Sequence, residues 1–378
     1  MKKKKPPLRL LIVKTSSMGD IIHTLPALND AFLLMPDMIC DWVVEENFAE
    51  IPRWHPAVRK VIPVAWRRWR KSIFSSETQA EWAAFRENLG EYEYDLVIDA
   101  QGLFKSAFLS LFARGFKVGF DSQSARERWA SLFYQHKFPV GRKLHAVFRL
   151  RCLFSQALNY TLPEGTPSYG VDKEQFLKAD EATVPAKPYV VFLHGTTWDT
   201  KHWPELYWEA LAKLVNQAGF DIKIPWGNPR ELERAKRIAT TCTMAEILPK
   251  LDLAGMAKVL AGARAAVAVD TGLGHLCAAL NVPTVSLYGP TNAKLTGAVG
   301  GNQTHLSAKF ECAPCLQSVC TYQGSSPLVK EVSELAGAGG GDISLKSDSP
   351  LKPPSPLYPS CFIGLGPDKV WDALVRVL

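Results

Sequence analysis

The chain has 378 residues, of which 47% are hydrophobic and 21% are charged, and its formal net charge is +7 at pH 7. This composition indicates a soluble globular protein, and the length suits about two domains with separate cores. No apolar run approaches the roughly 18 residues that a transmembrane helix needs, so any membrane contact is expected to be peripheral. The positive charge favours acidic partners, namely phosphorylated small molecules, nucleic acid or an anionic membrane face.

The N-terminus carries four lysines, Lys2 to Lys5, in front of a short apolar run. That run is followed by Lys14 and a polar turn instead of a small-residue cleavage site, so we do not expect a signal peptide. Eight cysteines at irregular positions suit a reducing compartment, where they stay thiols or bind metal. These features predict a cytoplasmic protein.

The first element is the segment RLLIVKTSSMGDIIHTLPAL. Its apolar residues up to Val13 predict a strand, and the helical spacing that starts at Ile21 predicts a helix after a turn. Asp20 lies at this turn. A carboxylate there can cap the helix. It can also serve catalysis, because loops after the strands of an open α/β sheet line the ligand crevice. The segment alone favours the cap.

The first half alternates strand-like and helix-like pieces. Further strands are predicted at Asp41–Glu45 and Asp95–Asp99, with helical stretches between them. Such alternation is typical of a parallel sheet with right-handed crossovers.

A basic and aromatic segment, VAWRRWRKSIF, lies in the same half. Arginine matches phosphate oxygens and tryptophan suits a wet apolar boundary, so the segment could receive a phosphorylated amphiphile. A solvated helix face and nucleic-acid binding are the alternatives. The cationic candidates of this half are Arg67, Arg68, Arg70, Lys71, Arg126, His145 and Arg149.

A polar, proline-containing passage at 163–188 predicts an interdomain connection, after which the alternation restarts with YVVFLHG. We therefore expect an α/β protein with two Rossmann-like domains that face each other across a cleft, at 1–183 and 184–366. The Gly/Ser/Pro-rich stretch 324–360 predicts a flexible insertion. The segment GPDKVWDALVRVL predicts a helix over 367–378.

Two strand-to-helix turns of the second half carry polar groups that suit a diphosphate. Hydroxyls, backbone amides and one ammonium can hold phosphate oxygens, and glycine allows close backbone approach. An ordinary polar loop and a helical histidine without a ligand are the alternatives. The residues are Thr196, Thr197 and Lys201 in GTTWDTK, and Asp270, Thr271, Gly272 and His275 in VDTGLGH. The sequence contains no Walker A motif, GxGxxG or GxSxG.

The segment CAPCLQSVC has a first cysteine pair with zinc-ligand spacing. It lacks a second CxxC or a HxxxH, so reduced thiols are favoured over a metal site. The cysteines concerned are Cys312, Cys315, Cys320 and Cys361.

Six segments, in matching order between about Arg9 and Thr291, together resemble the lipopolysaccharide heptosyltransferases, an inverting glycosyltransferase family. The segments are LIVKTSSMGDIIHTLPAL, DWVVEENFAEIP, VIDAQGLFKSA, DTKHWP, PWGNPRELERAKR and VDTGLGHL. The resemblance implies a GT-B fold and transfer of L-glycero-D-manno-heptose from ADP-heptose to the first Kdo of Kdo2-lipid A. This would happen on the cytoplasmic face of the inner membrane, without a metal cofactor and without nucleic acid.

The resemblance also implies roles for single residues. Asp20 matches the family's general base, and Lys201 is expected to stabilise the departing ADP. The donor-site positions are Thr196, Thr197, Lys201, Glu231, Leu251, Asp270, Thr271, Gly272 and His275. The acceptor-site candidates are Ser17, Arg67, Arg68, Trp69, Lys71, Arg126, His145 and Arg149. Leu251 stands where close relatives carry Met, which is a conservative change for an apolar group against adenine.

The C-terminal part departs from this pattern, because the cysteines and the ending CFIGLGPDKVWDAL look more like family members that extend an already heptosylated core. Transfer to such a core is therefore an alternative. A GT-B nucleotide-sugar epimerase is another, although it would need no lipid site and the Arg/Trp segment counts against it. The third is a non-catalytic basic module that binds nucleic acid or anionic lipid.

Overall fold

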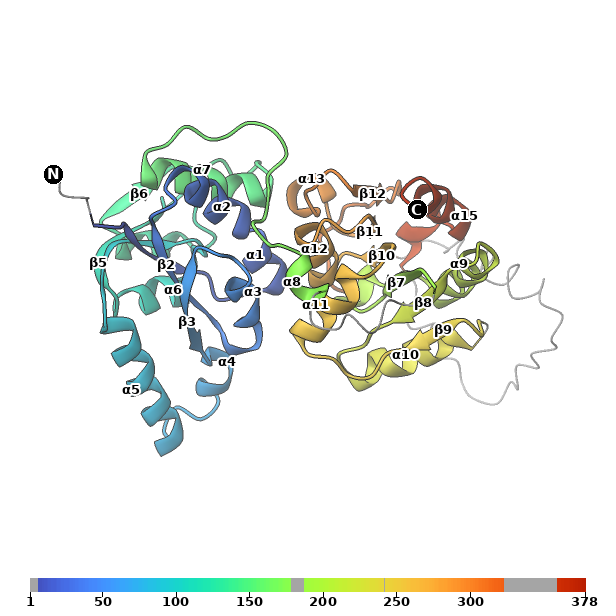
Figure 1. Cartoon of the computed structure of the whole chain (residues 1–378), viewed down its shortest axis with the longest axis horizontal. Helices are drawn as coiled ribbons and strands as arrows, with labels where there is room; N and C mark the ends of the chain where they lie inside the picture. The colour runs from blue at the N-terminus through green and yellow to red at the C-terminus, as the bar shows by residue number, and fades with distance from the viewer. Residues whose placement is uncertain (1–5, 178–186, 241, 323–358) are drawn as a thin grey trace. The chain divides into compact units, whose positions relative to one another are not determined.

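The computed structural model describes residues 6–177, 187–240, 242–322 and 359–378. The chain divides into two compact units, Met1–Asp172 (unit 1) and Lys173–Leu378 (unit 2). Figure 1 shows that each unit is an α/β body built on one sheet. The predicted domain boundary at 183/184 lies outside the described residues, as does the predicted insertion up to residue 358.

Unit 1 contains a parallel sheet of six strands in the order β3-β2-β1-β4-β5-β6. The strands are β1 (Arg9–Val13), β2 (Ile39–Glu45), β3 (Val58–Val64), β4 (Glu93–Asp99), β5 (Arg114–Phe120) and β6 (His136–Phe138). The helices are α1 (Met18–Ile22), α2 (Leu25–Leu34), η1 (Glu46–Phe48), α3 (Glu50–Arg53), α4 (Trp66–Trp69), α5 (Ser76–Gly90), α6 (Phe104–Ser110), η2 (Arg128–Phe133) and α7 (Ala146–Leu158).

Unit 2 contains a second parallel sheet of six strands, in the order β12-β11-β10-β7-β8-β9. The strands are β7 (Tyr189–Leu193), β8 (Asp221–Ile224), β9 (Ala245–Ile247), β10 (Ala265–Val269), β11 (Thr284–Tyr288) and β12 (Gln303–Ser307). The helices are α8 (Glu174–Leu177), η3 (Asp199–Lys201), α9 (Glu205–Gln217), α10 (Pro229–Ala239), α11 (Leu253–Ala261), α12 (Gly272–Ala279), α13 (Ala293–Thr296), η4 (Ser360–Phe362) and α15 (Pro367–Val375).

Both sheets have the strand order of a Rossmann fold, so the predicted α/β class is confirmed. In each sheet the order reverses between the unit's first and fourth strands: β1 and β4 in unit 1, and β7 and β10 in unit 2. Ligands of open α/β sheets bind beyond the carboxyl ends of the strands at such a point. The fold therefore directs attention to the loops that follow these four strands.

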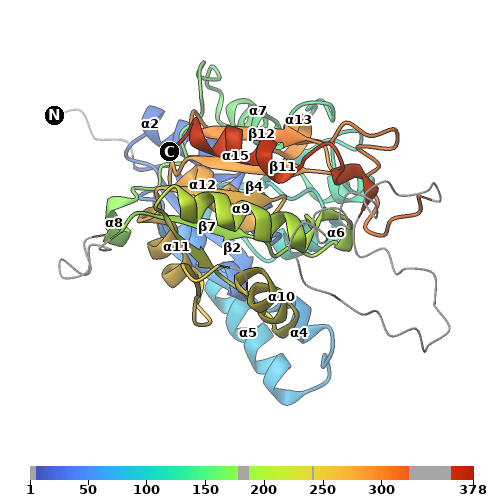
Figure 2. The same cartoon turned by 90° about the vertical axis from the view of Figure 1, so that its right-hand side faces the viewer.

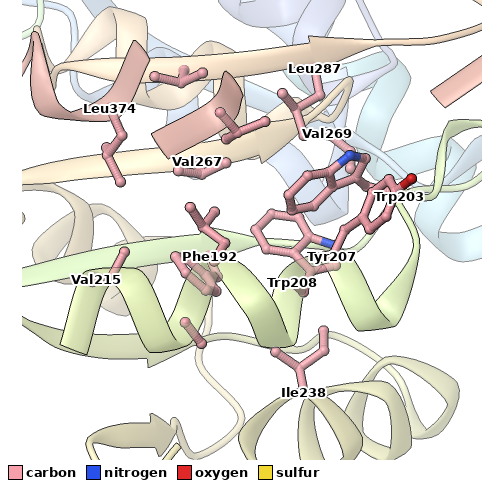
Figure 3. Close-up of a cluster of buried hydrophobic side chains, with 14 of the residues drawn as sticks. Phe192, Trp203, Tyr207, Trp208, Val215, Ile238, Val267, Val269, Leu287 and Leu374 are labelled. Carbon is pink, nitrogen blue, oxygen red and sulfur yellow. The ribbon is translucent and has the colours of Figure 1, made fainter. Parts of the chain in front are cut away.

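The sheet of unit 2 packs on a cluster of aromatic and aliphatic side chains (Figure 3). The ring centroid of Trp203 lies 5.0 Å from that of Trp208, with the two rings nearly perpendicular, and the ring centroid of Phe192 also lies 5.0 Å from that of Trp208. Helix α15 packs beside α9 and β11 (Figure 2). Its Val370 and Leu374 are buried in the same cluster, so this helix is part of the unit 2 core.

The first strand, turn and helix form as predicted, but the helix cap is a different residue. Ser17, with extended backbone, is the N-cap of α1, and Asp20 is the third residue of the helix. The Asp20 carboxylate accepts a hydrogen bond from the Ser17 backbone N–H at 2.9 Å, in a capping-box arrangement. Asp20 therefore takes part in the cap as its third-residue partner, and Ser17 instead of Asp20 is the N-cap residue.

Within the described ranges, no helix is long and apolar enough to cross a membrane.

Candidate active site

Asp20 lies beside the loop that follows β1, at the switch point of unit 1. Its Oδ2 atom accepts hydrogen bonds from the Ser17 N–H at 2.9 Å and from the Ser17 hydroxyl at 3.0 Å. Ser17 is exposed and Asp20 is half-buried. The carboxylate is thus held in place by its own helix turn.

The surroundings of Asp20 keep it ionised. Burial raises the pKa of Asp20, but the charge of Lys14, the hydrogen bonds from Ser17 and the charge of Arg126 together outweigh burial, so this pKa lies below its ordinary value. Lys14 itself is buried and donates from Nζ to the backbone oxygen of Ala100 at 3.0 Å. Burial lowers the pKa of Lys14, while the carboxylates of Asp20 and Asp99 oppose this.

Gln101, which follows β4, holds the loop that leads to Asp20. Its Oε1 accepts from the backbone N–H groups of Thr15 and Ser16, at 3.1 and 3.3 Å, and its Nε2 donates to the Ser16 oxygen at 2.6 Å. Lys105 donates from Nζ to the Ser16 hydroxyl at 3.2 Å. These contacts cross the switch point, so the position of Asp20 depends on both strands.

Two residues of the predicted basic and aromatic surface have structural contacts instead. The Trp69 side chain is only 6% exposed because it packs in the unit 1 core, and its Nε1 donates to Glu81 at 2.5 Å. Arg68 forms ion pairs with Glu46 at 3.0 Å and Glu81 at 2.8 Å. The expectation that Trp69 presents its ring to an acceptor is corrected: in this short helix the ring turns inward.

Arg67 and Lys71 remain exposed on this segment. The backbone N–H of Arg67 donates to the Glu45 carboxylate at 2.9 Å, and its guanidinium lies 5.9 Å from the ring centroid of Phe48. The charge of Arg67 also lowers the pKa of Lys105, after the larger effect of burial. Arg67 is therefore within electrostatic reach of the lysine that holds Ser16.

The other predicted acceptor residues follow β5 and β6. Arg126 is exposed, and its charge acts on both Asp20 and Lys14. His145 is the N-cap of α7, where its Nδ1 accepts from the Val147 N–H at 3.2 Å. Arg149 donates to the Ser124 backbone oxygen at 2.6 Å, and burial lowers its pKa. Arg126 thus has the accessible charge, whereas His145 and Arg149 also support the local backbone.

At the switch point of unit 2, Lys201 and Asp270 form an ion pair of 2.8 Å between Nζ and Oδ2. The Thr196 hydroxyl donates to the Asp270 backbone oxygen at 3.1 Å, which joins the loop after β7 to the loop after β10. His275 Nε2 lies 4.0 Å from Asp270 Oδ1. The structure therefore brings these four predicted donor residues together.

Glu231 reaches the same edge of the sheet from the first turn of α10. Its backbone N–H donates to the Asn228 side chain at 3.1 Å, and its Oε2 accepts from the Gly227 N–H at 2.7 Å. A Cβ atom on Gly195 would lie 2.8 Å from the Glu231 carboxyl carbon, so only glycine leaves room for this carboxylate next to Thr196.

The remaining predicted donor residues lie on the neighbouring loops. Thr271 is the N-cap of α12 and Gly272 is its first residue, so the backbone N–H groups of this helix begin beside Asp270. Thr197 is exposed. Leu251 is half-buried before α11, and a Cβ on Gly255 would lie 3.3 Å from its Cδ2.

The four cysteines considered for metal binding differ in exposure. Cys312 is exposed, Cys315 and Cys320 are half-buried, and Cys361 is buried. Among the described residues, no group of three or more His, Cys, Asp or Glu side chains is arranged to hold a metal ion.

Sequence reasoning missed three residues of the unit 1 site, namely Lys14, Gln101 and Lys105. Lys14 and Gln101 come just after strands whose carboxyl ends meet at the switch point, and this position was the signal that could have identified them. Lys105 lies in the first turn of α6, where nothing in its spacing sets it apart from a solvated helix residue.

The two sites offer complementary chemistry. In unit 1, an ionised carboxylate lies among cations, an arrangement that suits a base for an anionic substrate. In unit 2, an oriented ammonium, hydroxyls and a helix N-terminus are arranged as in a phosphate site.

Comparisons with known proteins agree with this architecture. Residues 82–325 match the model of glycosyltransferase family 9 (heptosyltransferase). The chain is 53% identical over 372 residues to lipopolysaccharide heptosyltransferase 1 of Pseudomonas aeruginosa PAO1, covering 98% of both chains. The structure of E. coli heptosyltransferase WaaC with ADP has a TM-score of 0.77 and 49% identity, covering 87% of this chain and 100% of that one. The WaaC structure with ADP-2-deoxy-2-fluoro heptose has a TM-score of 0.74 and 48% identity, and the match covers 86% of this chain and 99% of that one. The chain therefore belongs to glycosyltransferase family 9, the heptosyltransferases, and is a glycosyltransferase.

Proposed function

We propose that the chain transfers L-glycero-D-manno-heptose from ADP-heptose to the first Kdo of Kdo2-lipid A, with inversion at the anomeric carbon. The observation that carries this proposal is the 53% identity to a type 1 lipopolysaccharide heptosyltransferase along 98% of both chains. The solved relatives bound to ADP and to a fluorinated ADP-heptose support the choice of donor.

Unit 2 supplies the donor-binding groups in this proposal. Thr196, Thr197 and the first backbone N–H groups of α12 bind the diphosphate. Glu231 accepts hydrogen bonds from the ribose hydroxyls, as acidic residues do in many nucleotide sites, and Leu251 packs on the adenine. Asp270 and His275 contact the heptose.

Lys201 stabilises the departing ADP. Cleavage of the sugar-phosphate bond leaves additional negative charge on the diphosphate, and an ammonium held in position gains most when this charge develops. The 2.8 Å contact with Asp270 orients Lys201 before the donor binds. We propose that these groups serve the leaving group without a metal cofactor.

Asp20 acts as the general base. In a single in-line displacement, the attacking Kdo hydroxyl loses its proton as the bond to the anomeric carbon forms. The lowered pKa of Asp20 keeps the carboxylate ionised at neutral pH. A base this weak suits proton transfer late in the reaction, when the attacking oxygen has become acidic.

Exposed cations of unit 1 bind the acceptor. Arg67, Lys71 and Arg126 meet the carboxylates of Kdo and the phosphates of lipid A. This acceptor is a membrane lipid, so the proposal includes peripheral attachment to the cytoplasmic face of the inner membrane.

The direct test is to incubate the purified chain with ADP-heptose and Kdo2-lipid A and to measure ADP release. The proposal expects release only when both substrates are present, and a β-to-α change of anomeric configuration in the product by NMR. Activity only on an already heptosylated core would replace the acceptor. A modified ADP-sugar formed without any acceptor would indicate an epimerase. If the chain catalyses neither reaction, the non-catalytic binding module would be the better interpretation.

A further inference from the structure

We propose that an apolar groove on unit 1 is the surface through which the chain docks on an anionic lipid bilayer. The groove has a volume of about 420 Å³ and is lined by Phe104, Glu127, Trp129, Leu132 and Phe133. This inference rests on the proposed function, because a lipid acceptor requires the chain to reach a membrane, and it specifies which part of the chain does so.

The groove exposes large apolar side chains to an unusual degree. Trp129 is 63% exposed, Leu132 is 67% exposed and Phe104 is 51% exposed. Single exposed apolar residues are common on protein surfaces, but a contiguous group marks an interaction site. The groove therefore needs a partner that is itself apolar.

The fold holds these side chains outward. Ala130 and Tyr134 are buried in a small cluster with Ala107 of α6, which anchors η2 to the unit. The Phe104 and Phe133 rings meet edge to face, with centroids 5.3 Å apart. Trp129 precedes the Ala130 anchor and Leu132 lies between the two anchors, and both side chains project into solvent.

The charges beside the groove are mainly positive. The Glu127 carboxylate accepts a hydrogen bond from the Phe104 backbone N–H at 2.6 Å, so this negative group is engaged with the start of α6. Its neighbours Arg126 and Arg128 are both exposed, and the Arg128 guanidinium lies 5.5 Å from the ring centroid of Trp129. Aromatic rings beside arginines are the combination that binds the headgroup level of an anionic bilayer.

A bilayer fits this surface better than a protein does. A stable protein partner buries roughly 20–30 residues on each side, whereas this groove presents only five lining side chains.

The groove also adjoins the proposed acceptor site. Glu127 donates its backbone N–H to the oxygen of Gly102, the residue after Gln101, and the charge of Arg126 acts on Asp20. A lipid headgroup at the docked membrane would thus lie near the residues proposed to bind it.

The test is co-sedimentation of the full chain with vesicles of phosphatidylethanolamine and phosphatidylglycerol. The Trp129→Ser/Leu132→Ser variant should have a vesicle partition constant about tenfold lower than that of the wild type, since it removes two apolar side chains from the contact. Arg128→Gln should lower it about fivefold at low salt, and less at high salt. The matched control is Leu33→Ser/Leu34→Ser, two α2 side chains that are 69% and 51% exposed.

A second readout separates docking from catalysis. Turnover with a deacylated, water-soluble Kdo2 acceptor should stay unchanged in the Trp129→Ser/Leu132→Ser variant, and turnover with the same acceptor lipid in vesicles should fall. Equal vesicle binding by this variant and the wild type would overturn the proposal, as would an equal loss in the α2 control. If the wild type sediments with vesicles as described but transfers no heptose to either acceptor, the proposed function fails and the docking surface stands.

Discussion

The Lys201 ammonium lies 2.8 Å from the Asp270 carboxylate, and the two side chains are only 15% and 9% exposed. The Thr196 hydroxyl donates a hydrogen bond to the backbone oxygen of the same aspartate at 3.1 Å. These contacts join the loops after β7 and β10, and they orient the Lys201 ammonium before any donor binds. Such preorganisation lets an ammonium act on a developing charge without first being reordered.

Lys201→Ala should lower kcat by roughly two to three orders of magnitude, in line with other lost transition-state contacts. The fold should be retained, because Lys201 lies in the short helix η3 and is not part of the buried hydrophobic cluster of unit 2. Steady-state kinetics with saturating ADP-heptose measures the effect. Near-normal turnover, or a strict requirement of the wild type for a divalent ion, would contradict the proposed role.

Gly195→Ala should weaken donor binding by about tenfold, as expected for one lost charge-assisted hydrogen bond. The new Cβ would lie 2.8 Å from the Glu231 carboxyl carbon and would push this flexible side chain away from its site. Titration with ADP measures the affinity, and Gly364→Ala is the control because its Cβ would meet nothing within 4 Å. Equal ADP affinity in all three proteins would show that Glu231 does not bind the nucleotide.

Neutralising the exposed cations of unit 1 should act on the acceptor alone. In the Arg67→Gln/Lys71→Gln variant we expect the KM for the lipid acceptor to rise about tenfold or more, and the KM for ADP-heptose to change little, since charge-assisted contacts to an anionic headgroup are lost. Arg114→Gln/Lys137→Gln removes the same charge elsewhere on unit 1 and serves as the control. A similar rise in both KM values would refute the assignment.

The stability of unit 2 should fall on mild acidification. Burial lowers the pKa of His194 to about 3 and that of His202 to about 4, compared with about 6.5 in an unfolded chain. The unfolded state therefore binds more protons below about pH 6.5, so the free energy of unfolding decreases from that pH down to about pH 4. The slope is on the order of 1 kcal/mol per pH unit for each histidine.

Urea unfolding at several pH values between 7 and 4.5 measures this decrease. His202→Gln is the variant to compare, because it removes one of the two titrating groups and should make the pH dependence shallower. Parallel curves for wild type and variant would mean that His202 does not stay neutral in the folded unit.

Regular buried strands were predictable from the sequence because they are short apolar runs that end in polar turns. This held for β1 and β10. The strand β3 (Val58–Val64) was missed, since it lies at the sheet edge and several of its residues are half-buried or exposed, which breaks the apolar pattern. The strand β12 at the edge of the other sheet was missed for the same reason.

The sequence indicated which candidate residues lie close together where a motif groups several polar residues in one turn, as around Asp270. Lys14 and Gln101 each follow a strand, which is a sequence signal for single residues, but that they belong to the same site became visible only once β1 and β4 were seen to be neighbours. The orientation of Trp69 was not predictable either, because a helix of four residues has too few turns to define a buried face.

The central claim is that Asp20 is the base of an inverting heptosyl transfer, and Asp20→Asn tests it most directly. The amide keeps the size of the side chain but removes its basicity. We expect the variant to fold and to bind ADP-heptose like the wild type, because the donor groups belong to unit 2. Its single-turnover rate with Kdo2-lipid A should fall by at least about a thousandfold, consistent with loss of a general base. A variant that transfers heptose at near the wild-type rate, but melts several degrees lower, would show that Asp20 only completes the capping box with Ser17.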